Sequence, residues 1–252
     1  MGKKTGPRPQ PQATLERPQD LPVKATLPRL RVEYGKDERL AYLGHLEVLA
    51  TMERCIRRAR LPFSLGNGFA RRMRVQYSQA LPVGASSACE YFDLRLDEEL
   101  DAEEALERLR AATPPALAPK RAGYVDGGLP ALEAWLTRSS WEVVALGAGF
   151  SPAELDAAIE TVRRQGTLTY MRGEKEKHVD LSACLVGWEC SEAPDGVGLA
   201  LETRSSNAGA LRPGILVDAA VRAANLTAPE ALRVRRVAQH AESPDGGLVA
   251  PL

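Results

Sequence analysis

The sequence has 252 residues, of which 44% are hydrophobic and 26% are charged, as in ordinary globular proteins. Lys and Arg together number 33 and so do Asp and Glu, which excludes a polycation that coats nucleic acid over its whole surface. No apolar run approaches the roughly 20 residues of a membrane span, and the first twelve residues contain no apolar signal-peptide core. We therefore expect a soluble, cytoplasmic protein with no membrane partner.

The first half of the chain predicts one small domain. Residues 1–28 contain six prolines and few apolar residues, which predicts a disordered tail. Leu30, Val32 and Tyr34 then alternate with charged residues, as in a half-buried strand. Apolar residues at 3.6-residue spacing predict a helix over about 44–60, which Pro62 ends.

Two further strands are predicted near 73–77 and 91–96, then a helix over 101–112 and a strand within 117–125. This β-α-β-β-α-β order is that of the ferredoxin-like arrangement, a four-stranded antiparallel sheet with both helices on one face. We predict such a domain over residues 29–126.

The same order recurs after the break at Asp126-Gly127-Gly128 and a short helix within 129–136. Ser151, Pro152 and Glu154 form a capping box and predict a helix that runs to about residue 165. The other predicted elements are strands at 141–146, 168–171, 178–181, 199–203 and 232–237 and a helix at 213–224. The prediction is an α+β chain with two tandem ferredoxin-like domains and separate antiparallel sheets, the second domain spanning 138–240, followed by a frayed end over 241–252.

The four cysteines do not predict a metal site. They lie at positions 55, 89, 184 and 190, form no CxxC pair and have no histidine at ligand spacing. We expect reduced, mostly buried thiols, with no metal and no cofactor.

An arginine block over 53–74 is the densest charge feature, since seven arginines there face one acid, Glu53. The intervening Gly66 and Gly68 permit positive φ and close backbone approach, and Phe69 and Tyr77 offer faces for stacking on an unpaired base. The residues predicted to bind an anion or RNA are Arg54, Arg58, Gly66, Gly68, Phe69, Arg71, Arg72, Arg74 and Tyr77. We expect Arg72 and Arg74 to share one face of a strand and to converge with Arg54 and Arg58 on one edge of the domain. The alternative is a solvated helix face on which Arg54 and Arg58 pair with acids.

His45 opens the first predicted helix and is the candidate catalytic residue, because histidine titrates near neutrality and serves as a general acid or base. The alternative is a packing role, since its angular position lies near Met52 and Ile56.

The stretch from Tyr42 to Leu94 resembles the radical-SAM-linked protein family. The resemblance rests on the motifs Leu43-Gly44-His45-Leu46-Glu47, Glu53-Arg54, Arg57-Arg58-Ala59, Leu61-Pro62, Gly68-Phe69, Ala80-Leu81-Pro82-Val83-Gly84, and Glu90-Tyr91 with Asp93. Where the family commonly has an Asn-Pro-His-Pro-like segment, this chain has Ala70-Arg71-Arg72-Met73 and is more basic. The resemblance implies partnership with a radical SAM enzyme, whose chemistry needs three clustered cysteines that the spacing here does not supply.

The leading hypothesis is an accessory module that binds structured RNA, or another anionic substrate, through the 54–74 region and works with a radical SAM enzyme. A second hypothesis comes from tandem ferredoxin-like domains with a histidine on the first helix, which resemble the CRISPR repeat-processing endoribonucleases. That resemblance implies metal-independent RNA cleavage with His45 as general base. A third hypothesis is a scaffold that binds only proteins.

Overall fold

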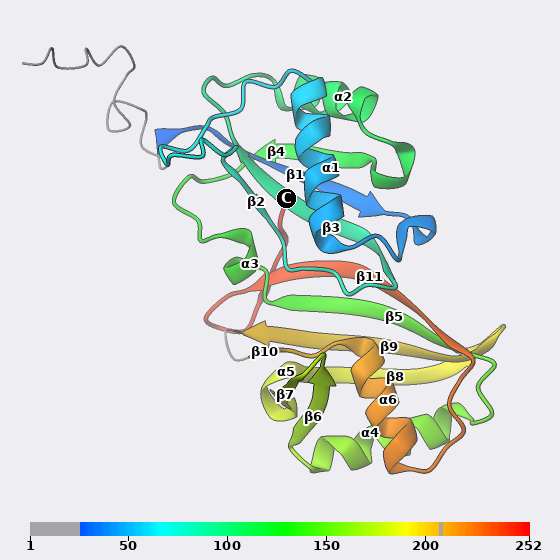
Figure 1. Ribbon diagram of the computed structural model, residues 1–252. Coiled ribbons are helices and arrows are strands. Elements are labelled where there is room, and N and C mark those ends of the chain that lie inside the picture. The colour runs from blue at the N-terminus through cyan, green and yellow to red at the C-terminus, as the bar shows by residue number, and fades with distance from the viewer. Residues whose placement is uncertain (1–25, 207–208) are drawn as a thin grey trace, which may run out of the picture.

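A computed structural model describes residues 26–206 and 209–252 (Figure 1). The described chain forms a ten-stranded sheet, a separate two-stranded hairpin and six α-helices. Every neighbouring pair in the large sheet is antiparallel except one. The predicted α+β class with a mostly antiparallel sheet is therefore confirmed.

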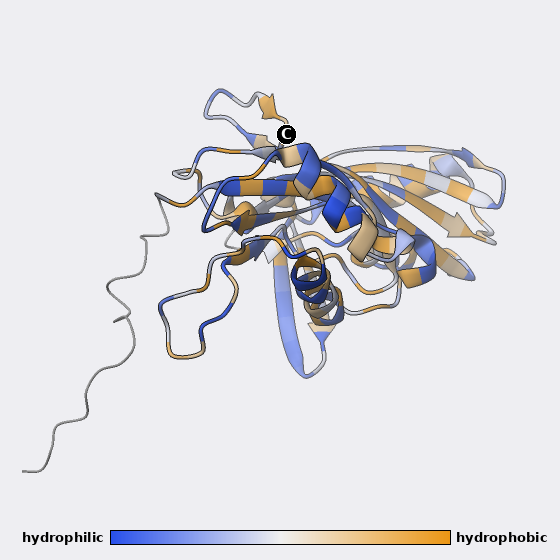
Figure 2. Ribbon diagram, turned by 90° about the horizontal axis from the view of Figure 1, so that it is seen from above, coloured by the Kyte–Doolittle hydropathy of each residue, from blue (hydrophilic) through white to orange (hydrophobic). Residues whose placement is uncertain are grey.

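The first half contains the predicted elements in the predicted order. They are β1 (Arg29–Lys36), α1 (His45–Arg58), β2 (Val75–Tyr77), β3 (Ala85–Arg95), α2 (Ala102–Ala112) and β4 (Pro119–Tyr124). The strands lie in the order β4-β1-β3-β2, and each neighbouring pair is antiparallel. The apolar residues of β1 pack under α1 and α2 in one core, as their alternation predicts. Hydrophilic and hydrophobic residues alternate visibly along the strands (Figure 2).

The second half repeats this order with insertions. Its elements are α3 (Leu132–Trp135), β5 (Arg138–Leu146), α4 (Pro152–Arg164), β6 (Thr167–Arg172), β7 (Lys175–Asp180), α5 (Leu181–Cys184), β8 (Leu185–Ala193), β9 (Gly196–Ser206), β10 (Gly209–Ala210), α6 (Pro213–Ala223), β11 (Ala231–Glu242) and β12 (Leu248–Val249). Four long strands lie in the order β8-β9-β5-β11, and α4 and α6 pack together over a second core. The capping box that starts α4 is confirmed, because Ser151 and Glu154 bond each other's backbone N–H.

Two details of the second half differ from the prediction. The strands predicted at 168–171 and 178–181 form the β6-β7 hairpin, which pairs only with itself. Strand β8, which lies beside β9, was not predicted from the sequence. Most side chains of β8 remain partly exposed, so its sequence lacks the alternation by which a half-buried strand is recognised.

The expectation of two separate sheets is wrong, because β3 and β11 join the halves into one sheet. This pairing is parallel and aligns Ala85–Ser87 with Val234–Arg236. The short β2 covers only Val75–Tyr77 and pairs with residues 92–94 of β3. The other end of β3 is therefore open for β11, whose pairing removes an unpaired sheet edge.

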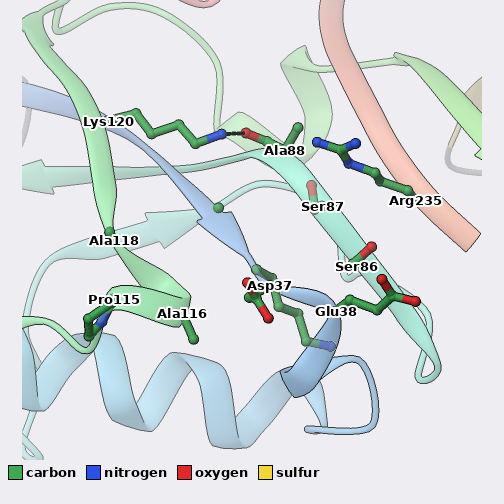
Figure 3. Close-up of a pocket in the computed structure, with 12 residues that line it drawn as sticks. Asp37, Glu38, Ser86, Ser87, Ala88, Pro115, Ala116, Ala118, Lys120 and Arg235 are labelled. Carbon is green, nitrogen blue, oxygen red and sulfur yellow. Dashed lines mark hydrogen bonds between the residues drawn. The ribbon is translucent and has the colours of Figure 1, made fainter.

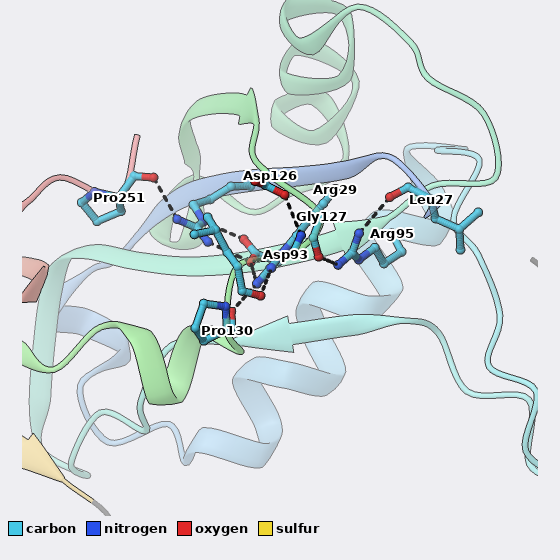
Figure 4. A network of polar contacts seen from close by, with 11 residues as sticks. Leu27, Arg29, Asp93, Arg95, Asp126, Gly127, Pro130 and Pro251 are labelled. Atoms are coloured by element: carbon cyan, nitrogen blue, oxygen red, sulfur yellow. Dashed lines mark hydrogen bonds and ion pairs between the residues drawn. The ribbon is translucent and has the colours of Figure 1, made fainter. Parts of the chain in front are cut away.

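A buried polar network covers the face of the first half opposite α1 and α2 (Figure 4). Arg29, Arg31 and Arg95 are at most 5% exposed, so the charged residues of β1 are buried as well as the apolar ones. Asp93 accepts hydrogen bonds from Arg29 Nε at 2.6 Å and from Arg31 Nε at 2.8 Å. Arg31 Nη2 also donates to Asp93, at 3.0 Å. Other guanidinium donors of the three arginines bond backbone carbonyls at Leu27, Gly127, Leu129, Pro130 and Pro251.

These bonds hold the linker between the halves and the C-terminal end of the chain on the sheet. The predicted frayed end over 241–252 is thereby corrected, since β12 pairs with β11 and Pro251 is buried beside Arg31. Of the predicted tail over 1–28, residues 1–25 lie outside the described residues. Among the described helices, none has the length and apolar character that a membrane crossing needs.

Candidate functional site

Helix α1 carries the first group of predicted binding arginines. The helix buries Val48, Met52, Cys55 and Ile56 and turns Arg54 and Arg58 to solvent. Arg54 donates to the Thr51 hydroxyl at 2.9 Å, and Arg58 has no ion-pair partner in the described chain. The predicted pairing of Arg54 and Arg58 with acids is therefore not what the described residues show.

A narrow loop carries the second group. Leu65 and Met73 pair across its base, and the Gly66 N–H donates to the Arg72 carbonyl at 2.8 Å. Phe69 lies at its tip with a fully exposed ring, which fits the predicted stacking face.

Positive φ occurs in this loop at Arg71, with φ 41°, and not at the two glycines. The expectation for Gly66 and Gly68 is therefore corrected, although open space around Gly68 leaves its backbone accessible. A left-handed conformation is uncommon for arginine and is found where the local fold or a function requires it.

Arg71 and Arg72 are exposed, and neither guanidinium group has a hydrogen-bond or ion-pair partner among the described residues. Arg74 is half-buried and donates to the Asn67 side-chain oxygen at 2.6 Å. Strand β2 begins only at Val75, so the strand alternation expected for Arg71, Arg72 and Arg74 does not apply.

The ring of Tyr77 is less available for stacking on a base than predicted. Its ring packs 6.0 Å from Phe92, and its hydroxyl donates to the Leu49 carbonyl at 3.4 Å. Burial raises the pKa of this hydroxyl above its ordinary value. The contacts make Tyr77 a support for α1 rather than an open stacking face.

Arg58 lines the same hollow as Arg108, which lies outside the predicted set of binding residues. Arg58, Arg60 and Arg108 line an open hollow between the C-terminal ends of α1 and α2. Arg108 also pairs with Glu104 one turn earlier on α2. Arg71 and Arg72 do not line this hollow, so the hollow and the loop tip carry separate groups of arginines. We call the two groups together, consisting of Arg58, Arg60, Phe69, Arg71, Arg72 and Arg108, the basic loop surface.

His45 lies apart from the basic loop surface, at the first residue of α1. It is half-buried, and burial lowers the pKa of its imidazole although the nearby carboxylates of Glu90 and Glu133 act in the opposite direction. Glu90 is buried and accepts from Arg236 Nη1 at 2.9 Å and from the Ser78 hydroxyl at 3.2 Å. The histidine thus borders a buried ion pair at the junction of the two halves.

A cavity of about 380 Å³ lies between the end of β1, β3 and β11 (Figure 3). Asp37, Glu38, Lys120 and Arg235 bring both signs of charge to its wall. The Lys120 ammonium donates to the Ala88 carbonyl at 2.5 Å, and Lys36 is held by three backbone carbonyls. These lysines stabilise the backbone around the cavity.

The four cysteines are free thiols; three are buried and Cys190 is half-buried. No cluster of three potential metal ligands occurs within the described ranges 26–206 and 209–252.

Comparison with solved structures finds distant likenesses. A chain of the crystal structure of a Cbf5-Nop10-Gar1 complex is 9% identical with a TM-score of 0.44, covering 89% of this chain and 53% of that one. A heavy metal efflux pump is 14% identical with a TM-score of 0.22, covering 86% of this chain and 29% of that one. The chain thus spans about half the length of the first of these structures.

No curated protein matches the sequence. A family model described as "uncharacterized protein conserved in bacteria (DUF2344)" matches residues 29–213, which is most of the chain. The protein therefore belongs to this family of uncharacterised proteins conserved in bacteria.

Proposed function

We propose that this protein is a non-catalytic accessory module that binds RNA through the basic loop surface. One observation carries the proposal. Four exposed arginines, Arg58, Arg60, Arg71 and Arg72, have no acidic partner among the described residues, and the exposed ring of Phe69 lies in the same loop as Arg71 and Arg72.

Two arginines on α4 show the contrasting, neutralised arrangement. Arg163 and Arg164 on α4 both pair with Glu160, at 2.6 and 2.9 Å. Unpaired guanidinium groups bind phosphate by charge-assisted hydrogen bonds, and an exposed aromatic ring stacks on an unpaired base. The combination favours single-stranded or looped RNA over a regular duplex, whose bases are not accessible for stacking.

The resemblance to the radical-SAM-linked family supports a radical SAM enzyme as the partner that modifies the bound RNA. In this proposal the present chain supplies binding and positioning, and the partner supplies the chemistry. The strand orders β4-β1-β3-β2 and β8-β9-β5-β11 support a finer description of the fold as two ferredoxin-like units fused through β3 and β11.

The endoribonuclease hypothesis has one observation in its favour. Burial lowers the pKa of His45, which favours the neutral imidazole that a general base requires. His45→Ala tests this role, since loss of a general base slows cleavage roughly 10²–10⁴-fold with little change in affinity. Failure of the wild-type protein to cleave any cellular RNA, with or without metal ions, would refute it.

The binding proposal is tested by titrating single-stranded RNA at several salt concentrations. Log K falls by about 0.7 per phosphate contact per decade of salt for single strands. Replacing Arg71 and Arg72 with Gln should therefore flatten the slope by about 1.4 and weaken binding. Phe69→Ala should weaken binding without changing the slope, because stacking releases no counterions.

Arg163→Gln with Arg164→Gln is the matched control, since it removes the same charge from arginines that Glu160 already neutralises. An equal change of slope in both double variants would show that binding follows net charge alone. Absence of RNA binding by the wild type at low salt would favour the protein-scaffold hypothesis.

A further inference from the structure

A second cavity, of about 180 Å³, lies where the two halves meet. Gln79 and Pro82 line it from the first half, and Trp141, Arg212 and Arg236 line it from the second. Pockets for drug-sized ligands begin at about 300 Å³, so this seam cavity suits a small molecule or a single functional group.

Arg236 places a buried guanidinium in the wall of the seam cavity. Its side chain is 3% exposed, its Nη1 lies 2.9 Å from a Glu90 carboxylate oxygen, and its guanidinium stacks 4.6 Å over the Trp141 ring. Its Nε is buried and has no acceptor among the described residues. Because a buried N–H without an acceptor is unfavourable, an oxygen atom of a ligand would stabilise this position.

Arg212 supplies a second donor at the start of α6. It is the N-cap residue of this eleven-residue helix, and its side chain makes no capping bond. Its half-buried guanidinium has no ion-pair partner in the part of the chain that the structure describes. The helix dipole adds a partial positive charge at the same end.

Hydroxyl groups and one carboxylate complete the wall. Ser139, Thr203 and Ser205 line the cavity, as does the exposed Glu133. Glu90 already neutralises Arg236, which leaves the charge of Arg212 to attract a ligand and that of Glu133 to oppose an anion. Such a balance favours an ion with a low charge.

We propose that the seam cavity binds a small oxyanion, a phosphate or carboxylate group, between Arg212, the Nε of Arg236 and the N-terminal end of α6. The site is separate from the basic loop surface and does not depend on RNA binding.

Isothermal titration of the full chain with inorganic phosphate and with acetate, at constant ionic strength, tests this site and distinguishes the two groups. We expect saturable binding of at least one ion to the wild type. Arg212→Gln should weaken binding about tenfold or more, because a charge-assisted hydrogen bond is lost. Glu133→Gln should strengthen it, since a repelling charge is removed.

Arg222→Gln is the matched control, because Arg222 lies on the same helix and already pairs with Asp218. It should leave binding unchanged, and so should the Arg71→Gln, Arg72→Gln double variant. Arg212→Gln should in turn keep RNA affinity, which separates failure of this site from failure of the proposed function. The inference would be overturned by the absence of saturable binding, by equal weakening in the Arg212 and Arg222 variants, or by weaker binding in Glu133→Gln.

Discussion

Asp93 is the only acid bonded to the buried arginines in Figure 4, so its removal tests how the first half is held together. The carboxylate is 2% exposed and accepts from Arg29 Nε at 2.6 Å and from Arg31 Nε and Nη2 at 2.8 and 3.0 Å. Asp93→Asn keeps the shape and removes the charge. It also turns an amide NH₂ group toward guanidinium N–H groups, so donors face donors.

We expect this variant to lose about 3–5 kcal/mol of unfolding free energy, because removing one partner leaves buried charges uncompensated. That is a large part of the 5–15 kcal/mol typical of a whole domain. Urea unfolding followed by circular dichroism measures the loss as a lower midpoint.

The matched control is Glu160→Gln, which also removes a carboxylate shared by two arginines, Arg163 and Arg164, on a solvent-facing helix. Its midpoint should change far less, because solvent screens exposed ion pairs. Equal shifts in the Asp93 and Glu160 variants would refute the argument that burial makes Asp93 important.

Two further predictions concern stability. Gly196→Ala should destabilise the fold by about 1–3 kcal/mol through backbone strain, because Gly196 has φ 151°. A steric clash adds to this loss, since a Cβ there would lie 2.0 Å from the Ala145 carbonyl oxygen. Gly173 has φ 62° and open space where a Cβ would lie, so Gly173→Ala should lower the free energy of unfolding by less. An equal loss in the two variants, measured by urea unfolding, would contradict the steric argument. For His45, the lowered pKa means that the unfolded state binds the proton more tightly, so stability should fall as pH drops below about 6.5. His45→Asn should reduce that slope between pH 7 and 5; an unchanged slope would assign the acid sensitivity to other groups.

The sequence predicts local elements well because local signals determine them. The capping box of Ser151 and Glu154 starts α4 as expected, and the alternation of Leu30, Val32 and Tyr34 places one face of β1 in the core. The opposite face could not be predicted in this way. Arg29 and Arg31 have the composition of a solvated face and are buried because the linker and the chain end, 100 and 220 residues away, lie over them.

The residues of the candidate sites also differ in whether local sequence signals predict them. The basic loop surface was predicted through Phe69, Arg71 and Arg72, since a dense run of arginines is visible in sequence. Arg108 was missed because only the packing of α2 on α1 brings it to the same hollow as Arg58. Arg212 and Arg236 were missed because they stand alone in the sequence, and the fold brings them to one cavity.

The joining of the two halves also decides how the protein has to be assayed. Arg236 extends from β11 to Glu90 on β3 and to the Gln79 carbonyl, while its guanidinium stacks on Trp141 of β5. Cutting the chain in the linker and separating the halves would strip this side chain of Glu90 and expose the unpaired edges of β3 and β11. An uncompensated buried charge and an open edge both favour unfolding or aggregation. Loss of RNA or oxyanion binding by an isolated half would therefore show only that the contact between the halves is needed for folding. Point variants of the whole chain test the two binding sites themselves.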